Sequence, residues 1–189
     1  VPSALSLTNE GTEEFFHWYF DHLDQKVDPL SGFWRYPNGI HDVLSKKLKN
    51  TPPKQADLGG AFHLFFMYER FQRKWPYPSQ AIDSTLKLQK WSGLWGNGST
   101  SFIDLDALYT LFRSSRNSFD YRRPDIEKAA IKYLIRTEKI LNNPKKVQLY
   151  YRNTHGLVGA IAAIAECQKF CPDLVNTAVP WRQSLDKAC

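Results

Sequence analysis

The sequence predicts an all-α protein, built as an α/α toroid or as an arc of one from about seven helices in helical pairs. Apolar residues recur at helical spacing in several segments, and no segment alternates as a strand would. Turn residues rich in Gly, Pro and Asn separate these segments. One pattern of helix and turn repeats along the chain. The length of 189 residues suits a single domain, 1–189, or part of a longer chain.

The first quarter of the chain contains one clear helix and one long connection. Residues 1–11 are small and polar, which predicts a loose lead-in. A helix is expected from Thr12, which can cap it, to about Gln25. Residues 35–56 are polar and rich in turn residues, so we expect a connection there, with a short helical piece at 42–48.

Five longer helices follow, and their ends are marked by caps and prolines. Asp57 is an expected N-cap, and Pro78 and Pro124 suit first helical turns. The helices are expected at 57–71, 78–90, 104–115, 124–141 and 154–170, with a last short one starting at 172. Those at 57–71, 104–115 and 154–170 are apolar nearly all round, which predicts burial on most sides.

The repeat is the strongest signal in the sequence. A Gly-x-Trp turn occurs twice and the start of a fully apolar helix three times. The copies are Gly32-Phe33-Trp34 and Gly93-Leu94-Trp95 for the turn, and Gly60-Ala61-Phe62, Asp106-Ala107-Leu108 and Gly159-Ala160-Ile161 for the helix start. Alternation of half-buried and fully buried helices predicts two layers, with the fully buried helices inside. An α-solenoid is the main competing arrangement.

The turns are interpreted as structural. Trp34 and Trp95 are expected to pack against the next unit. Gly32 and Gly93 are expected to allow a positive φ or a close approach of backbone.

These motifs resemble those of the terpenoid cyclase and protein prenyltransferase superfamily, over about residues 12–141. In that superfamily an outer helix ends in a Gln, a few residues and Gly-x-Trp. Gln89 with Gly93-Leu94-Trp95 fits this pattern, and Gln25 with Gly32-Phe33-Trp34 fits it loosely. Class II terpene cyclases also carry Asp-x-Asp-Asp at the start of an inner helix. Asp104-Leu105-Asp106-Ala107 falls at the equivalent place, with Ala instead of the last Asp.

The resemblance implies a terpenoid-cyclase-like domain that binds or cyclises an isoprenoid. Asp106 would then be the proton donor, and Asp104 would tune or hold it. A simpler interpretation needs no catalysis, because an N-cap at Asp104 and a first-turn acid at Asp106 explain both residues. We therefore leave open whether the protein is an enzyme.

Four further residues are candidate substrate-binding groups: Asp57, His63, Tyr109 and His155. Asp57, His63 and the Asp104–Asp106 pair could meet at one end of the inner helices. His63 could equally be a buried core histidine. His155 ends a polar cluster, 150–155, whose residue types suit a polysaccharide lyase or glycoside hydrolase; a loop with a helix cap explains them as well. A carbohydrate-active toroid and a non-catalytic repeat module are thus the alternative functions.

Composition restricts the partners. The 25 basic and 19 acidic residues give a net charge of +6, spread along the chain, which favours a solvated surface over a nucleic-acid interface. We expect no membrane span and no cofactor, and the three cysteines, Cys167, Cys171 and Cys189, are interpreted as ordinary thiols without a metal. No signal peptide is visible, which slightly favours the cytoplasm. A dimer or a neighbouring domain is expected to close the toroid.

Overall fold

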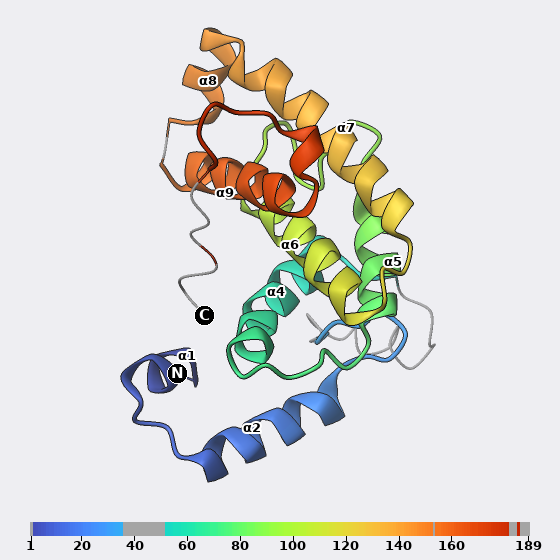
Figure 1. The fold of residues 1–189 in the computed structure, drawn as a ribbon, viewed down its shortest axis with the longest axis vertical. Coiled ribbons are helices and arrows are strands. Elements are labelled where there is room, and N and C mark those ends of the chain that lie inside the picture. The colour runs from blue at the N-terminus through green and yellow to red at the C-terminus, as the bar shows by residue number, and fades with distance from the viewer. Residues whose placement is uncertain (1, 36–51, 153, 182–184, 186–189) are drawn as a thin grey trace, which may run out of the picture.

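A computed structural model of the chain describes residues 2–35, 52–152, 154–181 and 185. Within these ranges the protein is all-helical and contains no strand, as the sequence predicts (Figure 1). The elements are α1 (Pro2–Thr8), α2 (Glu13–Lys26), α4 (Gln55–Arg70), α5 (Pro78–Leu88), α6 (Phe102–Asn117), α7 (Arg123–Leu141), α8 (Pro144–Tyr150), α9 (Thr154–Phe170) and the 3₁₀ helix η1 (Pro172–Leu174).

The structure contains two helices that the sequence analysis did not predict. One predicted helix falls on residues that the structure does not describe. The prediction of a loose lead-in at 1–11 is wrong, because Pro2–Thr8 forms α1. Pro144–Tyr150 forms α8, capped by Asn143, whose side chain accepts a hydrogen bond from the amide of Lys146 at 3.1 Å. The short helix expected at 42–48 lies outside the described residues.

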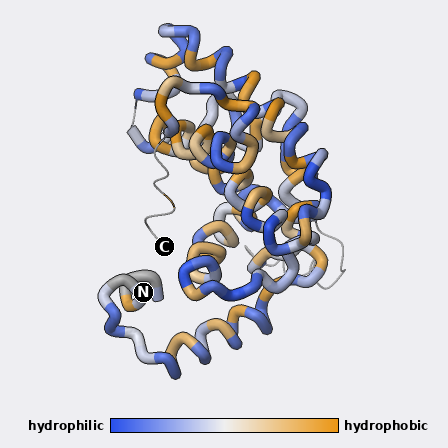
Figure 2. The backbone as a smooth tube through the Cα atoms, viewed as in Figure 1, coloured by the Kyte–Doolittle hydropathy of each residue, from blue (hydrophilic) through white to orange (hydrophobic). Residues whose placement is uncertain are grey.

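Helix α6 is the centre of the fold. It packs against α4, α5 and α9 and, over a shorter length, against α7. Every residue from Asp104 to Ser115 is buried, as expected for a helix that is apolar nearly all round. Figure 2 shows the mixed polar and apolar colouring of α7, which is the pattern of a helix with one face in solvent.

The three fully apolar helices run in the same direction. Near their first turns, a Cβ at Gly59 of α4 would lie 3.3 Å from the Asp106 carboxylate, and one at Gly159 of α9 would lie 2.7 Å from the amide nitrogen of Phe102. Near their last turns, Arg113 of α6 pairs with an acid on each of the other two helices. The start of α6 therefore lies next to the starts of α4 and α9, and its C-terminal half lies next to their ends.

The two Gly-x-Trp turns have equivalent structures. The indole N–H of Trp34 donates to the carbonyl of Leu23 at 2.8 Å, and that of Trp95 donates to the carbonyl of Thr85 at 2.7 Å. Each turn is thereby fixed to the end of the helix before it. Gly32 and Gly93 have φ values of +73° and +89°, which confirms the expected positive φ.

The residue that supports each turn differs. The Gln89 side chain donates to the carbonyls of Gly93 and Ala129, at 3.0 and 2.9 Å, and so joins its turn to α7. The proposed counterpart Gln25 is exposed. Asp28 takes the equivalent place and accepts hydrogen bonds from the Ser31 hydroxyl and the Leu30 amide.

Gly93→Ala should destabilise the fold strongly. A Cβ at this position would lie 2.6 Å from the carbonyl oxygen of Lys132 on α7, and the clash is with backbone. Left-handed strain and overpacking together should cost about 2–5 kcal/mol of unfolding free energy. Gly98→Ala is the matched control, since Gly98 has φ +78° and open space around it. Left-handed strain alone should lower the unfolding free energy of Gly98→Ala by about 1–2 kcal/mol. Equal losses in denaturant unfolding would contradict the close approach of the turn to α7.

Helix α9 is covered less completely than its sequence predicts. Val158 and Ile161 are 54% and 39% exposed, although most of the helix is buried. These two residues are three positions apart and so lie on one face of the helix. Apolar residues on the free side of α9 are thus left in solvent.

Candidate functional site

Asp104 is a structural acid that holds the start of α6. Its carboxylate accepts hydrogen bonds from the amides of Trp95 at 2.7 Å, Ser101 at 2.8 Å and Gly96 at 3.4 Å. Ser101 is the N-cap and Asp104 is the third helical residue, so the prediction of Asp104 as the N-cap is wrong by three residues. The side chain is fully buried, and this burial raises its pKa, although the backbone hydrogen bonds oppose the rise.

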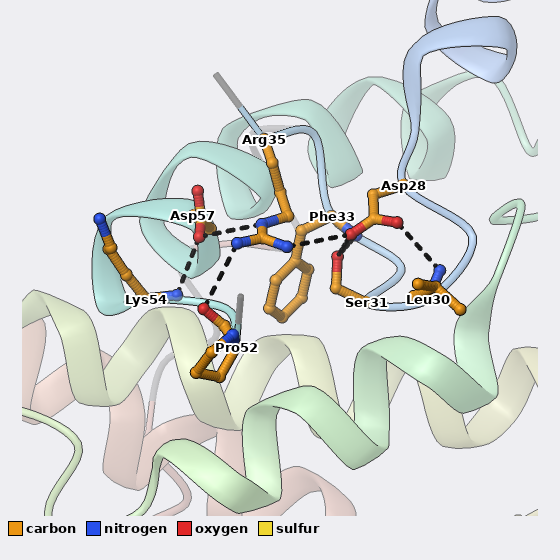
Figure 3. Close-up of polar contacts among 8 residues, drawn as sticks. All are labelled: Asp28, Leu30, Ser31, Phe33, Arg35, Pro52, Lys54 and Asp57. Carbon is orange, nitrogen blue, oxygen red and sulfur yellow. Dashed lines mark hydrogen bonds and ion pairs between the residues drawn. The ribbon is translucent and has the colours of Figure 1, made fainter. Parts of the chain in front are cut away.

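Asp57 occupies the same position at the start of α4. It accepts a hydrogen bond from the amide of Lys54, the N-cap, at 2.8 Å, and so is not itself the cap that the sequence suggested. Arg35, which follows the first Gly-x-Trp turn, bridges Asp57 and Asp28, each at 3.3 Å, as Figure 3 shows. Burial opposes ionisation of Asp28, but hydrogen bonds from Ser31, Leu30 and Arg35 outweigh it and lower the pKa of Asp28. Asp57 and Asp104 thus both tie an inner helix to the turn before it.

Asp106 differs from both of these acids. Its side chain is 7% exposed and lies against Gly59 of α4. It accepts no hydrogen bond from any residue that the structure describes. Burial, and next the charge of Asp104, raise the pKa of Asp106 to about 7. Near neutral pH this carboxyl is therefore poised between its neutral and charged forms.

An aromatic cluster begins one turn beyond Asp106. The Tyr109 ring packs edge-on against Phe62 and tilted against Phe66, with ring centroids 5.1 and 4.9 Å apart. Trp75 lies 6.3 Å from Tyr109 and stacks on Phe65 at 3.7 Å. Tyr109 is buried, so it forms part of the core packing between α4 and α6, one helical turn from the acid.

The far end of the same α6 face carries a cluster of one base and two acids. Asp106, Tyr109 and Arg113 succeed one another at spacings of three and four residues, which places them on one face. The Arg113 guanidinium lies 3.6 Å from Glu69 of α4 and 3.3 Å from Glu166 of α9, and it covers the Tyr109 ring at 5.0 Å. This three-helix ion cluster was not anticipated. An Arg inside an otherwise apolar helix was the signal that could have shown it.

The two candidate histidines are both exposed. The alternative that His63 is a buried core histidine is therefore wrong. His63 lies edge-on to Phe62 and one turn beyond Gly59, so it shares the α4 side on which Asp106 lies. His155 stacks on Phe102 with ring centroids 4.0 Å apart, at the joined starts of α6 and α9. Asp106 lies one helical turn from Tyr109 on α6. Asp57 and Asp104 instead accept hydrogen bonds that hold the start of α4 and of α6.

Other chemistry finds little support in the described part of the chain. No cluster of three or more His, Cys, Asp or Glu there has the arrangement of a metal site. Cys167 and Cys171 are buried free thiols, and burial raises the pKa of Cys171 to about 11. No helix among the described residues is both long enough and apolar enough to cross a membrane.

Comparison of the chain with protein-family models, with curated proteins and with solved structures gave no match.

Proposed function

We propose that the chain is an arc of an α/α toroid whose inner layer, α4, α6 and α9, binds an isoprenoid-like alkene beside Asp106. The observation that carries the proposal is the state of Asp106, a buried carboxyl that accepts no hydrogen bond from the described part of the chain and whose pKa lies near 7. Protonation of an alkene needs an acid that stays neutral until it reacts. In this step the Asp106 proton forms a C–H bond with the alkene π electrons, and a tertiary carbocation and the Asp106 carboxylate remain.

The surroundings of Asp106 suit this chemistry. Aromatic ring faces stabilise cations, and Tyr109, one helical turn along α6 from the acid, packs together with Phe62 and Phe66. Asp104 acts as a positioning residue, because its charge helps to keep the Asp106 proton in place. His63 and His155 would border the bound ligand.

We also propose that a second copy of the chain or a neighbouring helical unit closes the arc. The exposed Val158 and Ile161 on the free side of α9 support this, since the equivalent side of α6 is covered. Light scattering of the purified chain tests this proposal. If the partner is a second copy, the wild type should be a dimer and Ile161→Glu should dissociate it. A monomeric wild type with the same mass as Ile161→Glu would exclude a second copy as the partner.

A carbohydrate-binding function is the second candidate. A cavity of about 720 Å³ between α2 and α4 is lined by Trp18, Tyr19 and Trp34, and Asp57 stands in its wall. Trp18 is 60% exposed, and aromatic faces of this kind suit sugar rings. Tight binding of an oligosaccharide that Trp18→Ala abolishes would favour this function over the first.

Ligand binding and turnover with Asp106→Asn test the first proposal. Geranylgeraniol, as the alkene, and an oligouronide are titrated against the chain, and cyclised product is sought by mass spectrometry. We expect the alkene to bind, and Asp106→Asn to lower turnover by about 10²–10⁴-fold while binding persists. Asp21→Asn, an exposed acid on α2, is the control and should change neither. Unchanged turnover in Asp106→Asn would remove the mechanism, and binding of neither ligand would favour a non-catalytic repeat module.

A further inference from the structure

A second cavity lies where α1, α2 and the end of α4 meet, away from Asp106. Its volume is about 830 Å³, within the usual range of small-molecule sites. In Figure 1 the end of α4 and the turn after it face the α1–α2 corner, and Figure 2 colours that end strongly hydrophilic. Three phenylalanines and two arginines line the cavity.

The phenylalanines form a continuous apolar wall. The Phe71 ring lies 4.4 Å from the Phe16 ring and 5.3 Å from the Phe20 ring, measured between centroids. Phe16 and Phe20 are buried by the surrounding helices, and Phe71 is more exposed. An apolar body placed against these rings would be removed from water.

The arginines differ in how far their charge is balanced. Arg73 pairs with Asp24 at 3.3 Å and lies over the Phe20 ring at 4.6 Å. Among the described residues, Arg70 donates only to Ser6, through hydrogen bonds to its hydroxyl and, at 3.0 Å, to its carbonyl oxygen. Both acceptors are neutral, and no described carboxylate pairs with Arg70. The one acid in the lining, Glu13, is exposed and forms no ion pair with a described residue.

We propose that this cavity binds an amphiphilic anion, with a carboxylate or phosphate head on Arg70 and an apolar tail against the Phe16–Phe20–Phe71 wall. A guanidinium whose hydrogen bonds go only to neutral acceptors keeps its full charge for an incoming anion. The adjoining rings explain why the ligand needs an apolar body as well as a charged head. The site is independent of the function proposed for Asp106.

Calorimetry on the whole chain tests the site with four probes: decanoate, decyl phosphate, 1-decanol and inorganic phosphate. At least one of the two amphiphilic anions should bind, and the stronger of them identifies the head group. Decanol and inorganic phosphate should each bind at least about tenfold more weakly, since each lacks one half of the recognised chemistry. Decanol binding as tightly as the anions, or phosphate as tightly as decyl phosphate, would overturn the proposal.

Variants locate the binding. Arg70→Gln should weaken binding of the amphiphilic anion by about tenfold or more, which is the usual range for a charged hydrogen bond. Lys74→Gln removes the same charge from an exposed position nearby and should change affinity less than about twofold. Ser6→Ala removes the hydroxyl that accepts a hydrogen bond from Arg70, but it keeps the guanidinium and the backbone carbonyl acceptor at position 6, so it should bind nearly as wild type. Loss of binding in Ser6→Ala equal to that in Arg70→Gln would show that docking of α1, and not the guanidinium charge, is what matters.

Discussion

Asp106→Asn should stabilise the fold by about 4 kcal/mol at pH 8 and change it little at pH 4. The pKa of Asp106 is about 7 in the folded protein, against 3.8 for an ordinary Asp. Between these two values the unfolded chain has lost the proton and the folded chain has kept it. Wild-type stability from this group is therefore highest below pH 4 and falls until the folded carboxyl ionises near pH 7. Asn cannot ionise and does not suffer this loss.

The measurement is the difference in unfolding free energy between Asp106→Asn and wild type, by urea at several pH values. The titrating groups that do not interact with Asp106 behave alike in the two proteins, so their effects cancel in the difference. Asp104 is coupled to Asp106, and its contribution is included in the measured difference. The control Asp21→Asn should give a difference that stays flat with pH, because Asp21 is exposed. A flat difference for Asp106→Asn as well would mean that Asp106 has an ordinary pKa and is no poised acid.

Asp104→Asn should have the opposite effect on stability, with a loss of about 2–4 kcal/mol at pH 7. Both carboxylate oxygens accept from backbone amides: one from Trp95 and Gly96, the other from Ser101. An amide side chain would turn an NH₂ group toward one set of N–H donors, and the site is fully buried. The second Gly-x-Trp turn and the first turn of α6 would loosen together.

A matched control exists for this variant on α7. Asp125 is also an acid in the first turn of its helix, but it is exposed, and its partner is the Arg122 side chain at 2.8 Å. Asp125→Asn should cost less than about 1 kcal/mol, since exposed ion pairs contribute little. Chemical denaturation measures the loss of unfolding free energy in both variants. Equal losses would show that the hydrogen bonds from backbone amides to Asp104 do not stabilise the fold by the predicted amount.

Much of the helical architecture could be predicted from residues that act locally. Pro78 and Pro124 mark the starts of α5 and α7 because proline is tolerated in a first turn, and Thr12 caps α2 through a hydrogen bond from the Phe15 amide at 3.1 Å. The conformation of Gly32 and Gly93 followed from the repeat alone. Whether the helices curve into a toroid is not decided by such local signals.

The site was less predictable, because it depends on contacts between distant residues. The two acids Asp104 and Asp106 look alike in sequence, yet only Asp104 meets backbone donors within the described chain. Two of these donors come from a turn eight to nine residues earlier. Arg113 is surrounded by acids from two other helices, and no local pattern shows that pairing. Similarly, Asp28 rather than Gln25 supports the first turn, since side-chain direction at a helix end depends on how the turn folds.

Direct titration of the Asp106 carboxyl is the measurement that tests the account most closely. Carbon-13 NMR of the side-chain carboxyls, with the Asp106 signal assigned by its absence in Asp106→Asn, follows the group from pH 3 to pH 9. We expect a midpoint near pH 7, shifted down when Asp104 is replaced by Asn, because the neighbouring charge is then removed. A midpoint below about pH 5 would contradict the account, since Asp106 would then be ionised at neutral pH and could not serve as the proton donor.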